Sequence, residues 1–85
     1  MKEPPNHTGQ VDQCGDCWVR DDDVPGRYGN WWQVLDGPGW DEQVRGGLGT
    51  PRRWFEVEED FGPLVEASPE RTAAALELVR AAVVS

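Results

Sequence analysis

The chain has 85 residues and a mass of 9.5 kDa, enough for one small domain with a thin hydrophobic core. Sixteen acidic residues against eight lysines and arginines give a net charge of −8, which repels phosphate groups. This charge argues against direct binding of nucleic acid or of an anionic membrane. No apolar run approaches the ~20 residues of a membrane span, and the first residues lack the apolar segment of a signal peptide, so we expect a soluble cytoplasmic protein.

The first residues are rich in proline, glycine and polar side chains and show no apolar periodicity. They predict a disordered leader over residues 1–11, followed by a single small domain over residues 12–85.

Short apolar segments separated by turn residues then predict a set of strands. We expect strands over about 17–20, 30–35, 40–44 and 53–59. The turn composition between the second and third segments, Asp-Gly-Pro-Gly, favours a hairpin over residues 30–44.

The end of the chain predicts a helix over about 69–84. Ser68 is a hydroxyl N-cap, Pro69 suits the first helical position, and Glu70 places an acid in the positively polarised first turn. One apolar stripe follows, consisting of Ala75, Leu76, Val79, Ala82 and Val83. We expect this stripe to pack on the sheet, with a second copy of the helix as the alternative partner. The predicted fold class is α+β: a small antiparallel meander of three to four strands, SH3-like or an open sheet, with one C-terminal helix.

Cys14 and Cys17 form the only C-x-x-C motif. Redox enzymes use this spacing at a helix N-terminus, but a strand pattern follows it here. A structural zinc site needs four ligands, and His7 is the only other soft ligand in the chain. Three interpretations stay open: two unpaired thiols, half of a zinc site completed by an acid, water or a second chain, or a redox pair. We expect no cofactor, with zinc at Cys14 and Cys17 as the alternative.

The sequence contains no recognisable catalytic constellation. The single histidine lies in the predicted leader, so no Ser/His/acid or Cys/His set can be argued. The run Glu58–Glu59–Asp60 is typical of a solvated strand edge that discourages edge-to-edge pairing. We therefore expect a non-enzymatic protein.

Five tryptophans are a large number for a core of this size. One interpretation is that some are exposed anchors beside an acidic rim; the other is that all five supply core volume. Alternation along the second strand sends one ring of Trp31 and Trp32 to each face of the sheet. We predict a partner-binding face consisting of Trp31, Trp54, Glu56, Glu58, Asp21, Asp22 and Asp23.

The segment W-F-E-V-E-E-D-F-G-P-L at residues 54–64, with C-W-V-R at 17–20 and the Trp31/Trp40 segment, resembles a known group of proteins. It is similar to small Trp-rich β-meander proteins of unknown function from actinobacteria and their bacteriophages. The resemblance covers about residues 17–66 and implies a phage or prophage accessory protein, with no catalytic residues to transfer.

The leading hypothesis is a non-enzymatic, phage-encoded accessory protein that engages a host or virion protein through an acidic, Trp-bearing face. One alternative is a small zinc-binding protein. Another is an acidic nucleic-acid mimic that inhibits a DNA- or RNA-binding protein. We expect a monomer or homodimer that binds neither nucleic acid nor membrane directly.

Overall fold

Five short strands form one open antiparallel sheet in the computed structural model, which describes residues 2–26 and 28–84. The strands are β1 (Gly9–Val11), β2 (Cys17–Arg20), β3 (Asn30–Val34), β4 (Arg52–Arg53) and β5 (Val65–Glu66), in the order β4-β3-β2-β1-β5. The helices are α1 (Trp54–Phe61) and α2 (Pro69–Val84). The predicted α+β class, with an antiparallel open sheet and a C-terminal helix, is confirmed, with one more strand and one more helix than expected.

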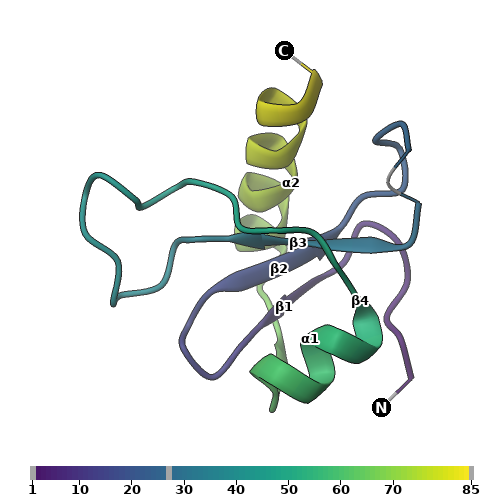
Figure 1. The fold of residues 1–85 in the computed structure, drawn as a ribbon, viewed down its shortest axis with the longest axis horizontal. Helices are drawn as coiled ribbons and strands as arrows, with labels where there is room; N and C mark the ends of the chain where they lie inside the picture. The colour runs from purple at the N-terminus through teal and green to yellow at the C-terminus, as the bar shows by residue number, and fades with distance from the viewer. Residues whose placement is uncertain (1, 27, 85) are drawn as a thin grey trace.

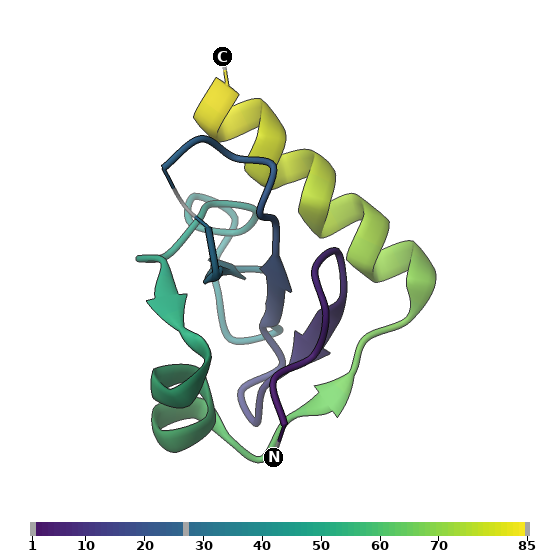
Figure 2. The same ribbon diagram turned by 90° about the vertical axis from the view of Figure 1, so that its right-hand side faces the viewer.

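The two helices cover opposite faces of the sheet (Figure 1, Figure 2). One apolar cluster lies under α2 and includes Cys17, Val19, Trp32, Val34, Ala75 and Val79. The other lies under α1 and includes Trp18, Trp31, Trp54, Val57 and Leu64. The predicted alternation along β3 is confirmed, because neighbouring rings Trp31 and Trp32 belong to different clusters.

The helix α2 forms where the sequence predicts it. The Ser68 hydroxyl accepts a 3.2 Å hydrogen bond from the backbone N–H of Arg71, as an N-cap does. Ala75 and Val79 are buried against the sheet, whereas Val83 is exposed near the end of the helix. No helix in the described ranges combines the length and apolar character that crossing a bilayer requires.

The strand predicted over 53–59 is wrong, because most of this segment forms α1. Trp54 and Val57 recur at the helical spacing of three residues and are both buried, while Phe55 is 66% exposed. The carboxylate of Glu56 accepts a 3.1 Å hydrogen bond from the backbone N–H of Arg53, which satisfies a donor at the start of the helix. The apolar residues of this segment therefore follow a period of 3.6 and not of 2.

The strand predicted over 40–44 and the hairpin over 30–44 are also wrong. Asp41 accepts hydrogen bonds from the backbone N–H groups of Gln43 and Val44, both at 3.1 Å, so the chain closes into a local turn. The sheet neighbours of β3 are β2 and β4 instead. Residues 35–51 form a long loop, on the left of Figure 1, and its returning part pairs with the end of β3 through an isolated antiparallel bridge between Leu48 and Val34.

The prediction of a disordered leader over residues 1–11, with a domain that starts at residue 12, is wrong, because Gly9–Val11 form the strand β1. This strand pairs with β2 on one side and β5 on the other, and residue 1 of the predicted leader lies outside the described residues. A Cβ on Gly9 would lie 2.5 Å from the hydroxyl of Thr72, so glycine permits the close approach of α2. Backbone pairing of this kind needs no apolar periodicity, which is why the sequence pattern did not reveal the strand.

Candidate functional site

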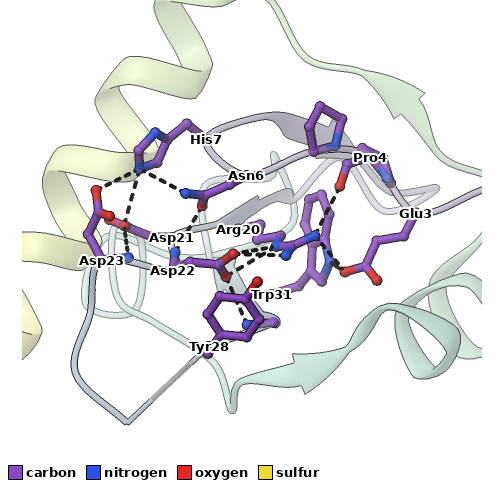
Figure 3. Close-up of polar contacts among 12 residues, drawn as sticks. Glu3, Pro4, Asn6, His7, Arg20, Asp21, Asp22, Asp23, Tyr28 and Trp31 are labelled. Carbon is purple, nitrogen blue, oxygen red and sulfur yellow. Dashed lines mark hydrogen bonds and ion pairs between the residues drawn. The ribbon is translucent and has the colours of Figure 1, made fainter.

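The three consecutive aspartates of the predicted binding face are mostly engaged inside the fold (Figure 3). Asp21 is fully buried, and its carboxylate accepts a 2.9 Å hydrogen bond from Nε of Arg80 on α2. Asp22 pairs with Arg20 at 2.8 Å, and the hydrogen bonds from this guanidinium hold the pKa of Asp22 below its usual range. Asp23 is the member of the run with an exposed side chain.

The predicted anchors Trp31 and Trp54 are core residues, so this prediction is wrong. Their exposed fractions are 0% and 6%, and the ring centroids lie 4.8 Å apart. The indole N–H of Trp31 donates to Glu3 at 2.9 Å, which provides the partner that a buried indole needs (Figure 3). Glu56 and Glu58 are half-buried on α1. Since Asp21 is buried as well, the structure does not assemble the seven predicted residues into one exposed face.

Four of the five tryptophans support the core-volume interpretation. Trp18, Trp31, Trp32 and Trp54 are all less than 9% exposed. Trp40 differs from them, with 37% of its surface exposed.

His7, Asp21 and Asp23 form a group with the composition of a metal site, since their candidate ligand atoms lie within 4.8 Å of one another. Nε2 of His7 is 2.9 Å from Asp23 and 3.5 Å from Asp21. The guanidinium of Arg80 lies in the same group, 2.9 Å from Asp21, 3.4 Å from the His7 ring nitrogen and 3.9 Å from Asp23. Arg80 already supplies the positive charge that a metal ion would bring, so we interpret this group as an ion-pair network that ties the N-terminal segment to α2.

The two thiols of the C-x-x-C motif are free and have different surroundings. Cys17 is fully buried in the cluster under α2, and burial, with a smaller contribution from the charge of Asp36, raises its pKa to about 11. Cys14 is exposed. The thiolate is both the metal ligand and the redox nucleophile, so a protonated and buried Cys17 favours neither the zinc nor the redox interpretation.

A cavity of about 360 Å³ opens between the β1–β2 turn, the loop after β3 and the end of α1. Its walls are Asp12, Cys14, Asp16, Gln33, Gly39, Trp40 and Phe61. The sequence predictions did not connect these residues, because the three segments are brought together only by the sheet and by contacts between loops.

Two buried carboxylates lie in the wall of this cavity. Asp12 is 5% exposed; its Oδ1 accepts the backbone N–H groups of Cys14 and Asp16 at 2.9 and 3.0 Å. Its Oδ2 accepts the indole N–H of Trp18 at 2.8 Å. The carboxylate therefore fixes the β1–β2 turn and the core tryptophan of β2 at the same time.

Asp16 is 2% exposed and joins the β1–β2 turn to the loop after β3. Its Oδ1 accepts the backbone N–H of Gly37 at 2.8 Å and the indole N–H of Trp40 at 2.7 Å. Its Oδ2 accepts the side-chain amide of Gln33 at 3.1 Å. A Cβ on Gly37 would lie 2.5 Å from Oδ1, so glycine permits this close approach.

All six hydrogen bonds to these two carboxylates come from N–H groups, so both side chains act purely as acceptors, as ionised carboxylates do. Within residues 2–26 and 28–84, neither Asp12 nor Asp16 forms an ion pair. The cavity wall thus holds two hydrogen-bonded carboxylates, and the charge of Arg71 acts on Asp16 without forming an ion pair with it.

Two aromatic rings form the apolar part of the wall. Trp40 is held by its bond to Asp16, and Phe61 packs on Trp18 with ring centroids 4.9 Å apart. The guanidinium carbon of Arg52 lies 5.4 Å from the centre of the Phe61 ring. Aromatic faces attract cations, so rings and carboxylates together favour a positively charged group in this cavity.

No protein-family model matches the chain, and no curated protein or solved structure matches it either. The resemblance to Trp-rich meander proteins therefore stays a prediction.

Proposed function

We propose that the protein is a non-enzymatic binding protein that engages a positively charged protein partner through the acidic surface around the cavity. The observation that carries this proposal is that three arginines are paired with aspartates of the same chain while many exposed glutamates among the described residues are not paired. Three arginines are committed to internal ion pairs at 2.8 to 2.9 Å: Arg20 with Asp22, Arg71 with Asp36 and Arg80 with Asp21.

Many carboxylates, in contrast, face solvent. Five exposed glutamates form no ion pair within the described part of the chain: Glu42, Glu59, Glu66, Glu70 and Glu77. Glu42 lies on the loop that carries Trp40, and Glu59 lies on α1, the helix that carries Phe61, so both belong to elements that form the cavity. We call Glu42 and Glu59 the rim acids. An acidic rim around an aromatic cavity complements a basic patch and accelerates its encounter.

The same proposal covers nucleic-acid mimicry, in which the basic patch of the partner normally holds DNA or RNA. We also propose a cytoplasmic location, supported by the two free thiols, which reducing compartments maintain. The proposed phage origin rests on the sequence resemblance alone.

The experiment compares a lysine-rich peptide, a glutamate-rich peptide of equal length and a short DNA duplex, each labelled for fluorescence anisotropy. We expect binding of the basic peptide that weakens as salt is added, and no binding of the other two. Glu42→Gln with Glu59→Gln should weaken binding. The matched control, Glu66→Gln with Glu77→Gln, makes the same change in net charge elsewhere and should leave binding close to wild type. Equal weakening by both pairs, or binding of the duplex, contradicts the proposal.

A further inference from the structure

We infer that the cavity binds an alkylated ammonium group, the head of a methylated lysine side chain. The assignment of this side chain to a protein partner rests on the proposed function, in which the partner is basic. The chemistry rests on the cavity itself, on its two buried carboxylates and two aromatic rings.

The carboxylates offer charge but little hydrogen-bonding capacity. Oδ1 of Asp12 and Oδ1 of Asp16 each accept two N–H donors already, and each Oδ2 accepts one. A carboxylate oxygen has about two lone-pair sites, so both Oδ1 atoms are saturated. A guanidinium needs both oxygens of one carboxylate for its two parallel hydrogen bonds, and neither Asp12 nor Asp16 can supply them.

Because these carboxylates can accept few further hydrogen bonds, we expect the cavity to bind an alkylated ammonium more tightly than a cation with many N–H donors. It carries a positive charge, brings few N–H groups or none, and presents methyl groups to the aromatic walls. Unmodified lysine would place three N–H donors beside carboxylates of which only the two Oδ2 atoms keep acceptor capacity, and it would lose its hydration there. The carboxylates of Asp12 and Asp16 attract both lysine and alkylated lysine. Alkylation replaces the N–H groups of lysine that would find no acceptor on these carboxylates.

The size and walls of the cavity fit a single side chain. Ligand pockets span about 300–1,000 Å³, and this cavity of about 360 Å³ lies at the small end of that range. Aromatic faces recognise quaternary ammonium groups in proteins by cation–π attraction. The ring of Phe61 already receives one cation, since Arg52 lies over it.

The two arginines that contact wall residues, Arg45 and Arg52, do not themselves line the cavity. Arg45 donates to the backbone carbonyl of Trp40 at 2.7 Å, and Arg52 lies 4.0 Å from Asp60. Neither forms a hydrogen bond to Asp12 or Asp16 in the described residues. The charge of Arg71 also acts on Asp16, but its guanidinium is held by the carboxylate of Asp36 and the carbonyl of Gly15, so it forms no hydrogen bond to Asp16 in the described residues.

The test uses three small probes: N-acetyl-trimethyllysine amide, the same molecule with carbon in place of the charged nitrogen, and N-acetyl-lysine amide. Titrations are followed by NMR on the backbone amides of Cys14 and Gly39, both in the cavity wall. We expect the trimethylated probe to bind about tenfold more tightly than its neutral carbon analogue, the size of one desolvated cation–π contact. It should also bind more tightly than unmodified lysine. Equal affinity for the charged probe and its neutral analogue overturns the inference.

Two variants at one position separate the ring from the hydrogen bond. Trp40→Phe and Trp40→Leu both lose the N–H that bonds Asp16, and only the phenylalanine variant keeps an aromatic wall. We expect Trp40→Phe to bind within about threefold of wild type and Trp40→Leu to bind about tenfold more weakly. Phe55→Ala removes an exposed ring outside the cavity and serves as the control. Equal affinities of the two Trp40 variants contradict the inference.

The two proposals fail in different ways. If rim-acid substitutions weaken the basic peptide but the trimethylated probe binds no better than its neutral analogue, the proposed function stands and the inference falls. If the trimethylated probe passes every test and no basic peptide binds, the cavity chemistry stands and the proposed function falls.

Discussion

The indole N–H of Trp40 donates a 2.7 Å hydrogen bond to Oδ1 of Asp16, a carboxylate that is only 2% exposed. The same oxygen accepts the backbone N–H of Gly37, so one atom holds both the loop after β3 and its tryptophan. This buried acceptor therefore fixes the side of the cavity that Trp40 forms.

Asp16→Asn should destabilise the fold by about 1–3 kcal/mol, because an NH₂ group would replace an oxygen that now faces N–H donors. Denaturant unfolding measures this change. Glu42→Gln, on an exposed side chain, should change the free energy of unfolding by less than about 0.5 kcal/mol. A tolerated Asp16→Asn would show that the carboxylate does not organise the loop.

The two cysteines should differ in reactivity toward an alkylating reagent at about pH 8. Cys14 is exposed, whereas Cys17 is 0% exposed and its pKa is raised to about 11. The thiolate is the reactive form, so one thiol per folded chain should react rapidly and both after denaturation. Mass spectrometry of the labelled chain identifies the site, with Cys14→Ser as the control. Fast labelling of Cys17 in the folded protein would refute this account of its burial.

Asp22→Asn tests the contribution of the Arg20–Asp22 pair as a function of pH. Because the folded pKa of Asp22 is lowered, its stabilisation is present above the unfolded value of about 3.9 and is lost as pH falls through the folded pKa. The difference in free energy of unfolding between wild type and variant should be largest near neutral pH. It should shrink below about pH 4. A difference that stays constant down to about pH 2.5 would contradict the assignment.

Trp31→Ala and Trp54→Ala should each cost about 3–5 kcal/mol, because both rings are buried and in contact with each other. Phe55→Ala is the matched control on α1, and it should change stability by less than about 0.5 kcal/mol because Phe55 is 66% exposed. Thermal unfolding of the three variants is sufficient. The sequence analysis predicts the opposite for both tryptophans, as exposed anchors, so a Trp31→Ala or Trp54→Ala variant as stable as wild type would restore that prediction.

The sequence predicted β2, β3 and α2 because each carries a local signal. Apolar alternation marks the two strands, and the Ser68–Pro69 start marks the helix. The helix α1 was missed because Phe55 and Val57 have the spacing of one face of a strand, while Trp54 and Val57 have the spacing of one face of a helix. Tertiary burial of Trp54 and Val57 decides between the two.

The cavity could not be predicted from local patterns. Asp12 lies two residues before the C-x-x-C motif and Asp16 lies within it, and the motif directed the sequence analysis to the thiols, while Trp40 lies 24 residues after Asp16. The available signal was Gly37 in a Gly-Pro-Gly turn, since a glycine permits close approach to its backbone. Which acid approaches it is set by the pairing of β2 with β3, a non-local property.

The most direct test of the central claim, that an alkylated ammonium group lies between the rings of Trp40 and Phe61, is an intermolecular nuclear Overhauser measurement on the complex with N-acetyl-trimethyllysine amide. The account predicts cross-peaks from the probe's N-methyl protons to the ring protons of Trp40 and Phe61. Cross-peaks to the exposed rings of Tyr28 or Phe55 instead, or none to Trp40 at saturating probe, would contradict it.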